Sequence, residues 1–194
     1  NTASLKAQMD PVYSQYMFNP MAINPAYAGS RELFTAVLLH REQWLGFEGA
    51  PQTSSLALHT PLRNHNMALG LVAVRDEIGP SENFHISGVY AYKIKLYKGK
   101  LSFGLRGGIH NYRLNTSEIH FYQQNTFVNH TFNKAVPVFD FGMYYYTNNY
   151  YIGAAFSHLS SAQETFKLIY DKDPNNVIDY SFSNKPFVTL SGGL

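Results

Sequence analysis

The chain has 194 residues, enough for one domain, and its 15 Lys and Arg against 13 Asp and Glu leave a formal net charge of +2. This near balance argues against a nucleic-acid partner, because proteins of that class carry a strongly basic face. Charged residues make up only 14% and aromatic residues 15%, whereas ordinary soluble domains have roughly 25% charged residues. With no cysteine in the sequence, disulfide frameworks, thiol nucleophiles and Cys-based zinc sites are not expected.

The first 32 residues show neither helical nor strand periodicity. Residues 1–7 are interpreted as a signal-peptide remnant, cut between Ala7 and Gln8. Residues 8–32 are predicted to form a non-strand motif segment, because two Asn-Pro pairs interrupt it and a proline holds the preceding residue in an extended conformation. Its aromatic rings need burial, so we expect it to fold against the mouth or the interior of the following strands. Its candidate functional residues are Tyr13, Gln15, Tyr16, Phe18, Asn19, Asn24, Pro25 and Tyr27.

Residues 33–194 are predicted to form the strands of an antiparallel outer-membrane β-barrel, truncated at the C-terminus. Apolar and polar side chains alternate with a period of two, which is a β signature, and about 9–11 residues suffice to cross a bilayer as a tilted strand. About eight strands are expected, so the chain is interpreted as part of a larger barrel. They are Leu33–Trp44, Gln52–Thr60, Met67–Val74, Phe84–Leu96, a fifth from Leu101, Val138–Tyr146, Tyr150–His158 and an eighth from Phe187.

The predicted connections alternate in length. Those after strands two, four and six are short: Leu62–Asn66, Lys98–Lys100 and Thr147–Asn149. Those after strands one, three, five and seven are longer: Leu45–Pro51, Arg75–Asn83, Leu114–Pro137 and Leu159–Lys185. Outer-membrane barrels have short periplasmic turns and longer extracellular loops, whereas a soluble sandwich or lipocalin-like barrel, the alternative, needs no such order. Tyrosines that border the short turns are interpreted as an interfacial girdle, and they are Tyr97, Tyr144, Tyr145, Tyr146, Tyr150 and Tyr151.

The sequence offers no catalytic, cofactor or metal motif. Its eight histidines are scattered and form no HExxH pair, and no GxSxG elbow supports a hydrolase, so we expect neither an enzyme nor a bound cofactor. Lys93, Lys95, Arg106 and Asp140 fall on the predicted lumen face. They are interpreted either as a hydrated, charged interior or as an ion-pair network that packs an inward segment.

Several motifs together carry a family resemblance over nearly the whole chain. They are the opening Asp10–Pro20 with Asn24–Ser30, the block Arg41–Pro51, the block Asp76–Pro80, and the hairpin residues Tyr90–Tyr92 and Leu101–Leu105. On these residues the chain resembles the PorP/SprF family of outer-membrane proteins, which are tied to type IX secretion in Bacteroidetes.

The resemblance implies an integral outer-membrane barrel without catalytic residues. It would assist secretion or surface attachment of a partner, such as an adhesin-like client with a sorting domain, and be linked to gliding motility. The implied partners are the lipid bilayer, this client and other type IX secretion components. A passive diffusion porin is the alternative function. The candidate client-binding residues, in two loops, are Trp44, Gly46, Phe47, Gly49, Asp76, Ile78, Gly79 and Pro80.

Overall fold

The computed structural model describes residues 19–47, 49–115, 131–160, 163–169, 177–183 and 186–194. Its main feature is one antiparallel sheet of eight strands in the order β1-β2-β3-β4-β5-β6-β7-β10. The strands are β1 (Thr35–Glu42), β2 (Gln52–Pro61), β3 (Met67–Ile78), β4 (Ser81–Leu96), β5 (Gly99–Asn115), β6 (Thr131–Tyr146), β7 (Tyr151–Ser157) and β10 (Phe187–Gly193). This confirms the predicted all-β class and the eight strands of the sheet.

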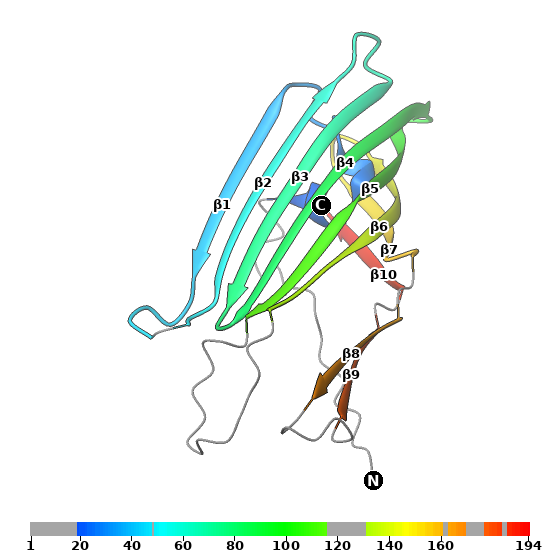
Figure 1. Ribbon diagram of the computed structural model, residues 1–194. Helices are drawn as coiled ribbons and strands as arrows, with labels where there is room; N and C mark the ends of the chain where they lie inside the picture. Colours follow the sequence, from blue (N-terminus) through cyan, green and yellow to red (C-terminus); the bar gives the residue numbers. More distant parts are fainter. Residues whose placement is uncertain (1–18, 48, 116–130, 161–162, 170–176, 184–185) are drawn as a thin grey trace.

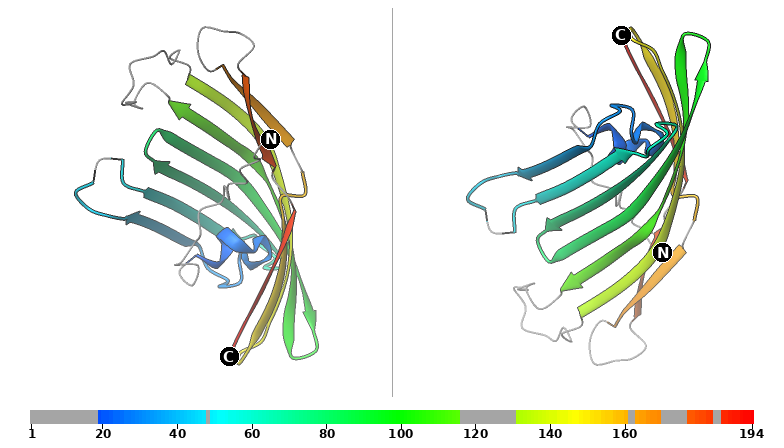
Figure 2. Two further views of the ribbon diagram at one scale, coloured as in Figure 1. Left: turned by 90° about the horizontal axis from the view of Figure 1, so that it is seen from below. Right: turned by 90° about the horizontal axis from the view of Figure 1, so that it is seen from above.

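The sheet curls into a half-barrel, seen along its axis in Figure 2. Two short helices, α1 (Pro20–Ile23) and the 3₁₀ helix η1 (Pro25–Tyr27), lie on its concave side. A small apolar cluster fills the space between them and the sheet, and it includes Met21, Ala57, Val72 and Val89. The principal packing of the fold is therefore between the start of the chain and the inside of the sheet.

The two faces of the sheet differ as the alternation predicts. Four apolar side chains in a common phase of the alternation, Phe103, Leu105, Phe141 and Ile152, lie on the convex side, where Leu105 is 57% and Ile152 62% exposed. Val72, Val89 and Ser102 alternate with such residues and are buried on the concave side. An apolar convex surface with a packed polar interior is typical of strands that cross a bilayer.

One predicted long connection is wrong. Arg75–Asn83 was expected to be a loop, but β3 continues to Ile78 and β4 begins at Ser81, leaving only Gly79 and Pro80 between them. The charged residues that suggested a loop are ladder residues: Arg75 binds Glu82 across the two strands at 3.0 Å. Cross-strand pairs of opposite charge stabilise such a ladder, so these charged residues belong to an extended β3–β4 hairpin.

Two further connections differ from expectation. β6 begins at Thr131, so residues up to Pro137 are strand, although the proline suggested a loop. The connection Leu159–Lys185 holds a separate hairpin of β8 (Gln163–Ile169) and β9 (Val177–Ser183), which was not predicted. These strands pair only with each other in the described part of the chain. The turn predicted at Lys98–Lys100 is shorter, because β5 already begins at Gly99.

The turns after β2, β4 and β6 lie at one end of the sheet, and the connections after β1, β3 and β7, including the two-residue β3–β4 turn, lie at the other end. In Figure 1 the turns 62–66 and 97–98 are at the upper end, and the connection 43–51 and the β8–β9 hairpin are at the lower end. We call these the tight-turn end and the loop end. No helix among the described residues is long and apolar enough to span a membrane. The proposed domain limits at residues 7, 8, 32 and 33 stay predictions, and residues 1–18 lie outside the described part.

We predict that Leu105→Arg impairs assembly of the sheet, because it places a charge in the middle of the convex apolar face. A charge near the bilayer midplane costs about 2–4 kcal/mol in membrane barrels. Urea titration of the protein in lipid vesicles measures this loss. Leu45→Arg is the matched control, since Leu45 is equally apolar but lies in the connection at the loop end. Ready reaction of a Leu105→Cys variant with a water-soluble maleimide in intact membranes would contradict the face assignment.

Candidate functional site

The concave face holds residues 19–32, which we call the inner segment. Its local structure follows from its two Asn-Pro pairs. Pro20 stands in the first turn of α1, where its missing N–H costs nothing, and Asn24 ends that helix. The side chain of Asn24 then caps η1, because its Oδ1 accepts a hydrogen bond from the Ala26 N–H at 3.0 Å. Each Asn-Pro pair thus produces a short helix instead of a strand.

Asn24 also fastens the inner segment to the sheet. Its Nδ2 donates to the Met143 carbonyl of β6 at 2.9 Å and to the Ala154 carbonyl of β7 at 3.4 Å. The amide therefore satisfies its own donors and acceptor while it is buried, as buried polar groups require.

Glycines of the sheet make room for this contact. A Cβ at Gly104 would overlap the backbone of Pro25 and Ala26, and a Cβ at Gly142 would overlap Asn24 Oδ1. We call Gly104, Gly142 and the neighbouring Gly153 the glycine floor. Absence of side chains at these positions lets the helix backbone lie directly on the strands.

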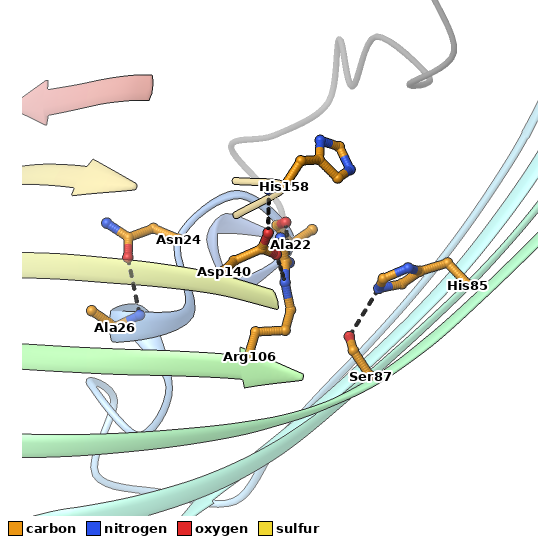
Figure 3. A network of polar contacts seen from close by, with 8 residues as sticks. All are labelled: Ala22, Asn24, Ala26, His85, Ser87, Arg106, Asp140 and His158. Carbon is orange, nitrogen blue, oxygen red and sulfur yellow. Dashed lines mark hydrogen bonds and ion pairs between the residues drawn. The ribbon is translucent and has the colours of Figure 1, made fainter. Parts of the chain in front are cut away.

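A buried ion pair forms a second attachment (Figure 3). Arg106 of β5 pairs with Asp140 of β6, and the Asp140 side chain is 1% exposed. The Arg106 Nη1 donates to the Ala22 carbonyl of α1 at 2.6 Å, and Asp140 Oδ1 accepts from the His158 N–H at 2.8 Å. One pair thus joins two central strands, the inner segment and the end of β7. Of the four residues predicted on the lumen face, Arg106 and Asp140 thus form an ion pair that packs against the inner segment.

A third attachment lies nearer the tight-turn end. Lys93 Nζ donates to the Gly29 carbonyl at 2.7 Å, and the Gly29 N–H donates to His59 Nδ1 at 3.2 Å. The Tyr27 ring packs edge-on against the rings of His59 and Tyr144. Tyr144 therefore faces the interior and not the lipid, which corrects its assignment to an interfacial girdle.

Other polar groups of this face pair with one another. His85 contacts Ser87 Oγ at 3.0 Å and packs edge-on against His110, which stacks on Tyr112. Among the described residues, no group of three or more His, Asp or Glu side chains is placed to hold a metal ion. The side-chain donors described above bind backbone carbonyls of the inner segment and the sheet, so these contacts hold the parts of the fold together.

The second candidate region is at the loop end. Trp44 and Phe47, 70% and 75% exposed, lie in the connection between β1 and β2, and Ile78 is also exposed at the end of β3. The Gly79 N–H donates to the Gly49 carbonyl at 2.9 Å, so this connection and the β3–β4 turn are joined. Both glycines have positive φ, 75° at Gly49 and 53° at Gly79, where a side chain would be strained. The hydrogen bond between Gly79 and Gly49 joins the two motif blocks, which are distant in the sequence, and their exposed apolar side chains lie at the same end of the sheet; we call these residues the loop-end surface.

The structure places the predicted site residues in three groups. Asn19, Asn24, Pro25 and Tyr27 belong to the inner segment; Trp44, Gly46, Phe47, Gly49, Ile78, Gly79 and Pro80 belong to the loop-end surface. Asp76 is separate, because it is buried on the concave face and accepts a hydrogen bond from Thr53 at 2.5 Å. Tyr13, Gln15, Tyr16 and Phe18 lie outside the described residues.

Sequence reasoning missed two members of the interior. His59 and Met21 were not singled out, yet His59 binds Gly29 and Met21 is 1% exposed. The available signal for His59 was its alternation with Leu56 and Leu58 on the polar side of a strand. Met21 carried no signal, because its burial depends on Gly70, where a Cβ would lie 2.9 Å from the Met21 sulfur.

A curled antiparallel sheet with an apolar convex face and a packed polar interior defines a membrane protein of the β-barrel type. The family model described as type IX secretion system membrane protein PorP/SprF matches residues 5–188. The chain belongs to this family. No curated protein and no solved structure matches it. Family membership gives the protein a role in type IX secretion and an interaction with other components of that system.

We predict that Gly104→Ala displaces the inner segment, because the new methyl group would overlap the η1 backbone. Overpacking of this kind costs about 1–3 kcal/mol. Limited trypsin digestion measures the displacement as faster cleavage after Arg31, and urea titration measures the loss of stability. The matched control is Gly88→Ala, since a Cβ at Gly88 on the neighbouring strand meets nothing within 4 Å. Equal cleavage rates in the two variants would contradict the role of the glycine floor.

We predict that Arg106→Met and Asp140→Leu each destabilise the protein by about 3–5 kcal/mol, because each leaves an unpaired charge in the interior. The double variant should lose less than the sum of the single losses, and a double-mutant cycle of urea midpoints measures this coupling. Arg75→Met, at an exposed ion pair, is the control and should cost about 0–1 kcal/mol. Additive losses would show that the two side chains act independently.

Proposed function

We propose that the protein is an outer-membrane scaffold that assists type IX secretion or surface attachment of a client protein. The client is an adhesin-like protein with a sorting domain, and the process is linked to gliding motility. Family membership supports the secretion role. The loop-end surface is the observation that supports the client role, because large exposed apolar side chains gathered at one place mark protein interaction sites, and Trp44, Phe47 and Ile78 are exposed at this end.

The proposed orientation puts the loop end outside the cell and the tight-turn end in the periplasm. Outer-membrane barrels carry their longer connections on the outside, and the connection 43–51 and the β8–β9 hairpin are at the loop end. Binding loops held by a rigid sheet suit capture of a secreted chain as it emerges. Detection of an epitope at Gly99 on the surface of intact cells would overturn this orientation.

The alternative function is passive diffusion, which needs an open lumen. The polar concave residues are compatible with it, but the inner segment covers the glycine floor and so opposes a free passage. Conductance in planar bilayers separates the two functions. A large steady conductance of the intact protein would favour the porin.

We predict that the double change Trp44→Ala and Phe47→Ala reduces the amount of sorting-domain proteins retained on the cell surface. Aromatic anchors of an interface each contribute about 2 kcal/mol or more when they are central to it. Quantitative proteomics of surface-shaved cells measures the retained proteins, and immunoblots check that the variant reaches the membrane. Tyr97→Ala is the matched control, because Tyr97 is an aromatic residue 91% exposed at the opposite end. Unchanged retention in the double variant would show that the client does not bind at Trp44 and Phe47.

A further inference from the structure

The two ends of the sheet differ in charge. At the tight-turn end, residues 30–34, 62–66 and 93–100 contain six basic side chains and one acidic side chain, a formal net charge of +5. The basic ones are Arg31, Arg63, Lys93, Lys95, Lys98 and Lys100, and the acidic one is Glu32. We call this group the basic mouth. The described loop-end residues 40–47, 49–53, 75–83, 113–115, 131–134, 163–169 and 177–183 contain five basic and six acidic side chains, a net charge of −1.

The basic side chains of the two ends also differ in how they are paired. At the loop end, Arg75 and Arg113 both bind Glu82, at 3.0 and 3.7 Å. In the basic mouth, Lys100 pairs with Glu32. Within the described part of the chain, no acidic side chain lies in ion-pair range of Arg63, Lys95 or Lys98, which leaves three cations available at this end.

The sheet register concentrates this charge. Lys95 and Lys100 stand directly opposite each other on β4 and β5, and like charges in that position destabilise a strand pair. A concentration of cations on one surface favours an anionic partner.

Glu32 shows which anion fits. It holds its carboxylate against Lys100 although its backbone has φ of 58°, a left-handed conformation that side-chain-bearing residues rarely adopt. Such strain persists where surrounding contacts compensate it. The protein's own Glu32 thus already binds a lysine of the basic mouth, so a carboxylate side chain of another polypeptide suits the same surface.

The direction of the side chains separates a protein partner from a lipid. Lys95 alternates with Ile94 and Leu96, which are exposed on the convex apolar face. It therefore shares the concave face with the buried Lys93 and points away from the bilayer side. A lipid phosphate would approach from the convex side, where the bilayer lies. A soluble polypeptide can instead approach the concave side at the tight-turn end, where Lys95 points.

We propose that the basic mouth binds an acidic segment of a partner polypeptide, with Glu32 occupying one corner of the same surface. This binding surface is at the opposite end from the loop-end client surface, so it is independent of the client and of its identity. In the proposed orientation it faces the periplasm, where a partner would be another component of the secretion system.

The test uses the intact protein in nanodiscs of zwitterionic lipid and a fluorescent ten-residue polyglutamate peptide as the probe. Binding is followed by fluorescence anisotropy. The triple variant Arg63→Gln, Lys95→Gln, Lys98→Gln should bind about tenfold more weakly, since it removes three exposed charge contacts. The control triple variant Arg41→Gln, Arg75→Gln, Arg113→Gln has the same change in net charge at the loop end and should bind as the unchanged protein does.

Glu32→Gln gives an independent result in the opposite direction. Removing the carboxylate frees Lys100, so this variant should bind the peptide more tightly than the unchanged protein, and its affinity should fall as salt screens the contact. Equal weakening in both triple variants would overturn the proposal, as would the absence of peptide binding. Loss of peptide binding in nanodiscs that contain anionic lipid would reassign the basic mouth to lipid headgroups.

Discussion

The buried pair of Arg106 and Asp140 is the interaction on which the interior depends. A charge removed from water is costly unless it is paired and its remaining hydrogen-bonding groups are satisfied. Here both partners meet that condition through the rest of the fold: Arg106 also binds the Ala22 carbonyl, and Asp140 also binds the His158 N–H. The pair is therefore stable only when the inner segment and the end of β7 are both in place, so it couples these parts of the chain.

Side-chain size on the concave face is the second constraint. Close contact of a helix backbone with a strand requires glycine beneath it, and the glycine floor supplies this under η1. Towards β2, β3 and β4 the same face carries alanine and valine, and these pack against Met21 and Tyr27. The result is an interior that fits the inner segment by shape and by hydrogen bonds. The convex face is apolar along the middle of the strands and carries charged residues such as Arg75 and Glu82 near the loop end.

The sequence predicted the strands well, because a period of two over a long segment is a direct consequence of strand geometry. It predicted strand ends less well. The stretch Arg75–Asn83 was expected to be a connection, but it is strand except for Gly79 and Pro80, and Arg75 pairs with Glu82 across the extended hairpin. The β8–β9 hairpin was missed because it lies inside a connection identified by length alone. Asn24 and Tyr27 were recognised from the Asn-Pro pattern, whereas Met21 and His59 needed the three-dimensional arrangement, since their partners are distant in the sequence.

The contacts of Asn24 have a consequence for the order of assembly. It is among the first residues of the fold in sequence order, yet the carbonyls that it binds are 119 and 130 residues later in the chain. Contacts of such separation form late, because a long loop must close before they add stability. The contacts of the inner segment with the sheet are therefore expected to form after the first hairpins, once β6 and β7 are in place. The full set of hydrogen bonds of Asn24 forms only after β6 and β7 have paired.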